Sequence, residues 1–308
     1  MNRLETPVTL MVFNRPETTR RVFAAVAAAR PARLLLIADG SRADRCGEAE
    51  RCEEVRKIVT AVDWPCQVET NFAGENMGCR QRVISGLNWV FSRVEEAIIL
   101  EDDCLPDPSF FPYCSQLLDR YRDRPQIAFI SGFNPLEKSF PLSFSYSYSL
   151  PMSFSIWGWA TWRRAWQEYD EHMRGWPEVR QAGLLRHLFP DEKVVAYWTR
   201  IFDSMHQGTG ANTWDYQWIY TCWTRNWLNI LPARNLVQNL GFGPGATHTT
   251  VTYPDYDIPA GSVSFPLAVP PAITAWPAYA MQAQKRLYAP GILRRIRRKL
   301  FRLRSASR

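Results

Sequence analysis

The sequence places charged and amide side chains directly after three short apolar runs. These groups are Glu101-Asp102-Asp103 after Ala97–Leu100, Asn14-Arg15 after Val8–Phe13, and Asp39 after Arg33–Ala38. Three adjacent carboxylates repel one another, and a divalent cation is the usual compensation. Mg²⁺ or Mn²⁺ binds one or two carboxylates and takes phosphate oxygens at its remaining positions. The acidic triplet is therefore a candidate metal–diphosphate site, and the alternative is a solvated turn or an N-cap for a helix beginning near Pro108.

The elements that position these side chains are predicted by alternating strand and helix patterns over the first 130 residues. Strands are expected at 8–13, 33–38, 66–70, 97–100 and 127–130, and helices at 16–29, 47–62, 78–91 and around 117–121. Apolar strands separated by long helices indicate an α/β fold with a buried, mostly parallel central sheet flanked by helices. Ligands bind at the carboxyl ends of the strands in such sheets, so the three polar groups should converge there.

Beyond about residue 133 the pattern changes. Phe140–Leu150 alternates aromatic residues with Ser, which is typical of an exposed strand or hairpin, and helices are expected near 194–205 and 214–226. Six prolines between Tyr253 and Pro277 predict an extended segment. The expected division is a domain of residues 1–250, with halves 1–133 and 134–250, then an extended arm (251–290) and a basic tail (291–308).

Several short motifs follow one another along residues 6–250. They are Phe13-Asn14-Arg15-Pro16, Ala38-Asp39-Gly40, Asn76-Met77-Gly78-Cys79-Arg80, Ile99-Leu100-Glu101-Asp102-Asp103, Gly158-Trp159, Trp214-Asp215, and Gly241-Phe242-Gly243 before Thr247-His248-Thr249. In this order they resemble GT-A glycosyltransferases of the broad family 2 type, with local resemblance to the N-acetylglucosaminyltransferase I group. The resemblance implies a Rossmann-like GT-A fold and an inverting, metal-dependent transfer of a sugar from a nucleotide-sugar, with a UDP-sugar favoured, to a hydroxyl acceptor.

The resemblance also implies contacts to the nucleotide. Asp39 would accept a hydrogen bond from the N–H of uracil, and Asn14 and Arg15 would approach the nucleotide. Arg80, near the start of the helix at 78–91, would face the nucleotide or diphosphate, where the helix N-terminus adds positive potential. Asp39 as a turn residue before Gly40 and Arg80 in a surface salt bridge are the alternatives.

For the metal, the resemblance implies that Asp103 is a direct ligand of Mn²⁺ or Mg²⁺. Glu101 and Asp102 would contact the ribose or the donor sugar, or bind the metal through water. A bound cation would neutralise the charge that develops on the departing nucleoside diphosphate. His248 would complete the metal shell, and the alternative is a structural or surface histidine.

On the acceptor side, an inverting transfer needs a general base, and the Trp-Asp match assigns that role to Asp215. The aromatic residues around Asp215 would raise its pKa by desolvation. The alternative is an N-cap for the following helix, and Asp170 is the second candidate base. Trp159, in the Gly158-Trp159 motif, would stack on a sugar, whereas Trp162 and Trp166 are expected to pack a helix against the core.

The charge of the chain is concentrated at one end. The net charge is +7, but residues 291–308 hold eight basic residues and no acidic one, which leaves 29 basic and 30 acidic residues in the rest. Apolar residues at 292/293, 296, 300 and 303 have helical spacing, so the tail suits an anionic membrane surface. A soluble basic tail is the alternative, and the absence of a recognition motif argues against nucleic-acid binding.

The cellular setting follows from the cysteines and the tail. Seven cysteines without a C-x-x-C motif favour reduced thiols in the cytoplasm, with a peripheral position on the inner face of the cytoplasmic membrane. The acceptor would be a glycan or lipid-linked sugar in bacterial surface polysaccharide or glycolipid synthesis. A non-catalytic nucleotide-sugar or glycan-binding protein is the alternative. A sugar nucleotidyltransferase fits less well, because no Gly-rich basic loop follows the first strand.

Overall fold

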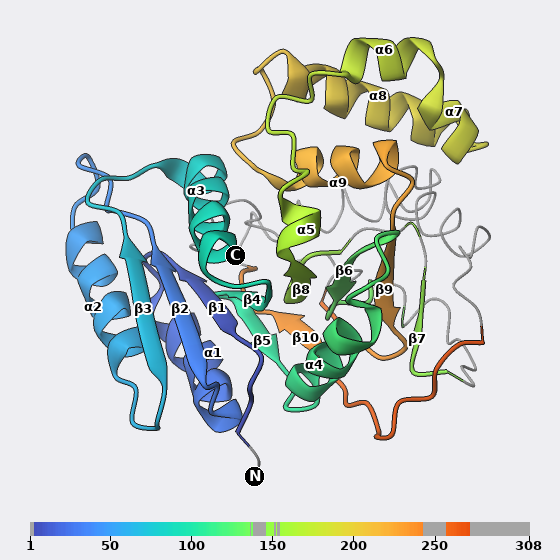
Figure 1. Ribbon diagram of the computed structural model, residues 1–308. Helices are drawn as coiled ribbons and strands as arrows, with labels where there is room; N and C mark the ends of the chain where they lie inside the picture. Colours follow the sequence, from blue (N-terminus) through green and yellow to red (C-terminus); the bar gives the residue numbers. More distant parts are fainter. Residues whose placement is uncertain are drawn as a thin grey trace.

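The computed structural model describes residues 3–135, 137, 146–150, 152, 155–242 and 257–271, and an eight-stranded sheet runs through its centre (Figure 1). The strands are β1 (Val8–Val12), β2 (Arg33–Ala38), β3 (Gln67–Phe72), β4 (Glu96–Glu101), β6 (Ile127–Ser131), β7 (Tyr148–Ser149), β8 (Trp159–Trp162) and β9 (Leu228–Pro232). They lie in the order β3-β2-β1-β4-β8-β6-β9-β7, and β7 and β8 run antiparallel to their neighbours. The α/β fold with a mostly parallel sheet is confirmed.

Helices cover both faces of this sheet. The helices of the described residues are α1 (Pro16–Ala29), α2 (Glu48–Thr60), α3 (Gly78–Arg93), α4 (Phe110–Tyr121), α5 (Arg163–Trp166), α6 (Trp176–Gln181), α7 (Leu184–Leu188), α8 (Glu192–His206) and α9 (Asp215–Thr224). Helices α1, α2 and α4 pack on one face against Leu34 and Leu36, whereas α3, α5 and α9 pack on the other against Leu35 and Ile37. The strands read as continuous apolar runs because both of their faces are buried.

Helix α9 joins the sheet to a helical group made with α6, α7 and α8 (Figure 1). Its Trp218 and Cys222 pack toward the sheet, while Tyr220 and Trp223 pack against α8 and its neighbours. A helix with apolar residues on opposite sides is buried on both sides. This packing fixes the position of α9, and Asp215 is the first residue of that helix.

Three expectations for the aromatic segments are wrong. Trp162 ends β8 and α5 begins one residue later, so Trp162 packs from a strand, while Trp166 lies on α5 as expected. Trp159 is only 1% exposed and stacks on Trp214 with ring centroids 5.5 Å apart, so it has no face for a sugar. In the described part of 140–150, Tyr148 is buried rather than exposed.

The extended arm is described only over residues 257–271, which contain no helix or strand. Ser147 N donates to Ala268 O at 2.7 Å, and Gly261 N donates to Asn235 O at 2.6 Å, so the arm lies along the β7 side of the sheet. The basic tail at 291–308 lies outside the described residues. Within those residues, no helix is both long and apolar enough to span a membrane.

Candidate functional site

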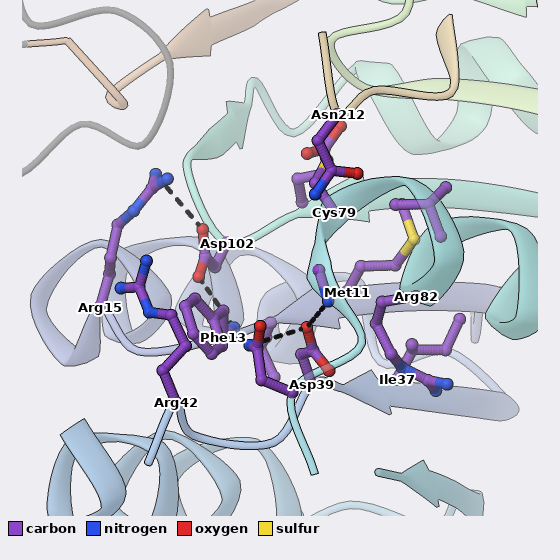
Figure 2. Close-up of a pocket in the computed structure, with 15 residues that line it drawn as sticks. Met11, Phe13, Arg15, Ile37, Asp39, Arg42, Cys79, Arg82, Asp102 and Asn212 are labelled. Atoms are coloured by element: carbon purple, nitrogen blue, oxygen red, sulfur yellow. Dashed lines mark hydrogen bonds and ion pairs between the residues drawn. The ribbon is translucent and has the colours of Figure 1, made fainter. Parts of the chain in front are cut away.

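The carboxyl ends of β1, β2 and β4 meet at one edge of the sheet. In register, Met11 pairs with Glu101 and Val12 pairs with Ala38, so the residues that follow these strands are neighbours. A cavity of about 320 Å³ opens at this edge (Figure 2). Its lining includes Arg15, Asp39, Glu101 and Asp102 among the predicted residues, together with Arg42, Cys79, Arg82 and Asn212. The predicted convergence of strand ends is therefore present.

Arg15 bridges the end of β1 to the acidic triplet. Its Nη1 lies 2.6 Å from Asp103 Oδ2 and 3.6 Å from Asp102 Oδ1. The Phe13 backbone N–H donates to Asp102 Oδ2 at 3.1 Å. The residues that follow β1 thus supply hydrogen-bond donors, the Phe13 N–H and the Arg15 guanidinium, which orient the carboxylates of Asp102 and Asp103.

The triplet has three carboxyl groups and one neighbouring guanidinium, that of Arg15. Burial and the charges of Asp103 and Asp102 raise the pKa of Glu101. Burial also raises the pKa of Asp102, against the opposing effect of Arg15. Burial alone would lower the pKa of Arg15, but the carboxylates of Asp102 and Asp103 outweigh it and raise that pKa. One guanidinium thus faces three carboxylates, an arrangement that favours a bound cation or hydrogen-bond donors from a ligand.

The fit to a divalent cation depends on how many ligands the chain supplies. Among the described residues, no group of three or more His, Cys, Asp and Glu side chains is arranged to hold a metal ion. Asp102 and Asp103 nevertheless match the one or two carboxylates that Mg²⁺ or Mn²⁺ takes when phosphate oxygens fill the other positions. A Cβ on Gly241 would collide with Asp103 Oδ2, so the chain that leads toward His248 passes directly against this carboxylate. His248 itself lies outside the described residues.

Asp39 organises the loop before α3. Its Oδ1 accepts from the backbone N–H groups of Gly40 and Met77, each at 2.9 Å. Its Oδ2 accepts from Gly78 N at 3.0 Å and from Asn76 Nδ2 at 3.1 Å. A Cβ on Gly40 would collide with the Glu75 backbone, so only glycine lets this loop approach. The carboxylate lies at the cavity with four donors already on it, and its contact with a base stays a prediction.

Two predicted nucleotide contacts lie away from the cavity lining. Asn14 Nδ2 donates to Glu48 Oε1 at 2.8 Å. Arg80 Nη2 donates to the Glu171 carbonyl at 2.7 Å, and its Nε lies 3.6 Å from Glu171 Oε1. Arg80 thus makes the ion pair that was its alternative, and the nucleotide contacts of Asn14 and Arg80 stay predictions.

Sequence reasoning missed a second charged pair at the cavity. Glu48, at the start of α2, accepts from Arg42 and Asn14, and hydrogen bonding to Arg42 lowers the pKa of Glu48 to about 2. The Arg42 guanidinium lies 5.6 Å from the centre of the Phe13 ring. Glu48 resembles any acidic residue in a first helical turn, so its sequence position gave no signal of this role.

Arg82 and Asn212 are further cavity residues that the motifs did not identify. Arg82 is buried, its Nη2 donates to Asn71 O at 2.8 Å, and burial lowers its pKa. Asn212 Oδ1 accepts from Arg80 N at 3.2 Å, which ties the segment before α9 to the start of α3. Asn212 stands three residues before Asp215, so the Trp-Asp motif was the available signal.

Asp215 is the first residue of α9, and two neighbouring residues hold its carboxylate. Thr213 Oγ1 donates to Asp215 Oδ1 at 2.6 Å, and Tyr216 N donates to the same oxygen at 2.9 Å. The charge of Asp215 contributes to the raised pKa of Glu101, and it also contributes, after burial and Glu101, to raising that of Cys79 to about 12. The candidate base therefore lies within electrostatic reach of the triplet. Asp170 instead accepts from the backbone N–H groups of its own turn, which include Arg174 N at 2.7 Å.

The solved structures that resemble this chain share little sequence with it. No family model matches the chain, and no curated protein sequence matches it. One similar solved structure is a UDP-glucose pyrophosphorylase complexed with UDP-glucose, at 11% identity and TM-score 0.26, covering 48% of this chain and 64% of that one. Another is mouse xyloside xylosyltransferase 1, at 11% identity and TM-score 0.35, covering 70% of this chain and 81% of that one.

Proposed function

We propose that this protein is an inverting glycosyltransferase that moves a sugar from a nucleotide-sugar donor to a hydroxyl group of an acceptor. One observation supports this more than any other. Arg15, Glu101 and Asp102 line one cavity, Asp103 is paired with Arg15, and the charge of Asp215 at the start of α9 contributes to the raised pKa of Glu101. In the proposed reaction, the leaving group would be bound at Arg15 and the triplet, and Asp215 would act on the acceptor of the same substrate pair.

The cavity suits the nucleotide of the donor. Met11, Phe13, Ile37 and Val83 supply apolar surface for a base and ribose, and polar groups surround them. A mostly apolar pocket with a few convergent polar groups is the usual form of a small-molecule site. UDP-sugars are the favoured donors, with Arg15 next to the diphosphate.

The acidic triplet would hold the cation and the adjoining sugar or ribose. Asp103, with Asp102, would bind Mn²⁺ or Mg²⁺ shared with the diphosphate, and His248 is proposed as a further ligand. A bound cation neutralises charge on the departing nucleoside diphosphate. Glu101 would accept hydrogen bonds from hydroxyl groups of the donor.

Asp215 would act as the general base. It takes the proton of the acceptor hydroxyl as that oxygen bonds to the anomeric carbon and the bond to the nucleoside diphosphate breaks. Thr213 and Tyr216 N hold Oδ1 of the carboxylate, which fixes its orientation before the substrate arrives. The leaving nucleoside diphosphate departs on the opposite face of the sugar, so the configuration inverts.

The acceptor and location are proposed from the sequence. A glycan or lipid-linked acceptor in bacterial surface polysaccharide or glycolipid synthesis would be used at the inner face of the cytoplasmic membrane. The basic tail at 291–308 would bind anionic lipid headgroups there.

The test is nucleotide release from UDP-, dTDP- and GDP-sugars with Mn²⁺, with and without simple sugar acceptors. We expect turnover of at least one donor. Asp103→Asn and Asp215→Asn should each reduce kcat about a hundredfold or more, whereas the exposed Asp119→Asn should not change it. Nucleotide binding without turnover of any donor would favour the binding-protein alternative. Release of UTP from UDP-glucose and pyrophosphate would favour a nucleotidyltransferase.

A further inference from the structure

A short antiparallel pair of strands fixes the backbone beside the acidic triplet. Strand β5 (Cys104–Pro106) begins directly after Asp103 and pairs antiparallel with β10 (Val237–Asn239) (Figure 1). Leu240 N donates to the backbone carbonyl oxygen of Asp103 at 2.7 Å. The chain that leaves β10 is therefore tied to the backbone of the proposed metal ligand.

Gly241 then brings this chain against the side chain of Asp103. A Cβ on Gly241 would lie 2.1 Å from Asp103 Oδ2, far inside van der Waals contact. Gly241 does not adopt the left-handed conformation, so glycine is required here for space rather than for backbone freedom. Asn239 Oδ1 accepts from Gly241 N at 2.6 Å and holds the glycine in place.

The two oxygens of the Asp103 carboxylate consequently differ in their surroundings. Oδ2 lies 2.6 Å from Arg15 Nη1 and packs against Gly241. Oδ1 accepts only from the Cys104 thiol, at 3.6 Å, and a thiol is a weak donor. Oδ1 is therefore the oxygen that remains for a cation.

Asp102 is held in a similar way. Its Oδ2 accepts from Phe13 N at 3.1 Å, while its Oδ1 lies 3.6 Å from Arg15 Nη1, too far for a hydrogen bond. Each of these two carboxylates thus has one oxygen bound by a strong donor and one oxygen with a weaker contact. A carboxylate held in this way offers a cation one oxygen rather than two.

The number of oxygens that a carboxylate offers distinguishes between cations. Mg²⁺ requires near-octahedral coordination and is bound through one or two carboxylates, and Mn²⁺ shares its preference for six oxygen ligands. Ca²⁺ takes more oxygens in a flexible shell that often includes bidentate carboxylates. Carboxylates that each offer one oxygen therefore favour the smaller ions.

We infer that Gly241 is a positioning residue that keeps Asp103 Oδ2 on Arg15 and leaves Oδ1 for the cation, so that the site selects Mg²⁺ or Mn²⁺ against Ca²⁺. This rests on the proposed function, in which Asp103 binds a cation shared with the diphosphate. A side chain at position 241 would push the carboxylate away from Arg15. Both the affinity for the cation and the discrimination against Ca²⁺ would then decrease.

Binding of Mn²⁺ to the full chain in the presence of UDP tests the inference. Loss of the EPR signal of free Mn²⁺ measures binding, with Mn²⁺ and UDP without protein as the blank, and Mg²⁺ or Ca²⁺ is then added as a competitor. Mg²⁺ should displace Mn²⁺ from the wild type at a concentration about tenfold or more lower than Ca²⁺ does.

Two variants and a matched control follow from the contacts of Gly241. Gly241→Ala should reduce the affinity for Mn²⁺ about tenfold or more and narrow the difference between Mg²⁺ and Ca²⁺, because the new Cβ displaces the Asp103 carboxylate. Asn239→Ala removes the acceptor of Gly241 N and should have a smaller effect in the same direction. Gly74→Ala is the control, since its Cβ would meet no other atom within 4 Å, and it should bind Mn²⁺ as the wild type does.

UDP affinity in the presence of a chelator separates positioning of the carboxylate from general damage. Gly241 does not line the cavity, so Gly241→Ala should keep the UDP affinity that the wild type has without a cation. Thermal melting checks that the variant is folded. If Gly241→Ala is unfolded, Asn239→Ala provides the same comparison with the wild type.

Several outcomes would overturn the inference. They are no binding of Mn²⁺ by the wild type, displacement by Ca²⁺ as readily as by Mg²⁺, an unchanged Mn²⁺ affinity in folded Gly241→Ala, and an equal loss of UDP affinity without a cation. Donor turnover by the wild type is measured separately. Turnover in the presence of a chelator would reject the inference and retain glycosyl transfer, whereas selective Mn²⁺ binding that depends on Gly241, without turnover of any donor, would support the inference and reject the transfer.

Discussion

The first prediction concerns Asp39, because its two possible roles, holding the loop before α3 or contacting a base, predict different melting behaviour for one variant. The Asp39→Asn variant keeps the shape of the side chain and replaces one carboxylate oxygen with an amide nitrogen. If the amide oxygen takes the place of Oδ1, it still accepts from Gly40 and Met77. The amide nitrogen then faces two donors, Gly78 N and Asn76 Nδ2, which lie 3.0 and 3.1 Å from Oδ2 in the native site.

The size of the effect follows from these contacts. A hydrogen bond to a charged group contributes about 1.5–3 kcal/mol, so losing two of them costs roughly 3–6 kcal/mol. A typical domain has a free energy of unfolding of only about 5–15 kcal/mol. The melting temperature of Asp39→Asn should therefore fall by on the order of 10 °C. Asn76→Ala, which removes one donor to Asp39, should lower it by roughly a quarter to a half of that amount.

Differential scanning calorimetry and UDP titration together distinguish the two roles of Asp39. Asp44→Asn is the control, since it makes the same chemical change on a side chain that is 79% exposed, and it should melt like the wild type. We expect Asp39→Asn to lose stability and, through the displaced loop before α3, UDP affinity as well. If Asp39→Asn melts like the wild type and loses only UDP affinity, Asp39 contacts the base directly and its structural role here is wrong.

Three other predictions concern the surroundings of the site. Gly158→Ala should destabilise the protein by about 1–3 kcal/mol in urea unfolding, because the residue has φ +63° and the new Cβ would lie 2.6 Å from Val237 Cγ2; unchanged stability would contradict the left-handed turn. Glu48→Gln should destabilise the protein above pH 4.5, where the Glu48 carboxylate is ionised in both the folded and the unfolded protein. The difference in urea midpoint between wild type and variant should shrink as the pH falls toward the folded-state pKa of about 2. A difference that does not change with pH would count against the ion pair of Glu48 with Arg42. Cys79 should react slowly with iodoacetamide near neutral pH, because burial and neighbouring carboxylates raise its pKa to about 12; mass spectrometry should find the exposed Cys46 modified first.

The fold was largely predictable because its signals are local. Helix α1 begins at Pro16 and β2 covers Arg33–Ala38, as the apolar pattern and the proline indicated. The error at Trp162 has a physical cause. Trp162 and Trp166 are four residues apart, a spacing that suits one helix face, but Trp162 lies on β8, which is buried by tertiary packing on both of its faces. Spacing alone does not distinguish a short buried strand from a helix.

The sequence predicted those site residues that directly follow the parallel strands. Arg15, Asp39 and the acidic triplet lie at one edge, because register brings the ends of β1, β2 and β4 together. Glu48 and Arg82 were missed, since their role depends on how α2 and α3 pack around the cavity.

The charge balance at the triplet is the main argument for the proposed cation. Arg15 supplies one positive charge to Glu101, Asp102 and Asp103. Burial raises the pKa of Glu101 and of Asp102, and the neighbouring carboxylates add to both shifts. A diphosphate would bring further negative charge to the same edge. Its binding without additional positive charge would be opposed by the carboxylates. Removing Mn²⁺ and Mg²⁺ with a chelator should therefore weaken UDP binding in the wild type. In the Asp103→Asn variant, which has one carboxylate fewer, UDP binding should depend less on the cation.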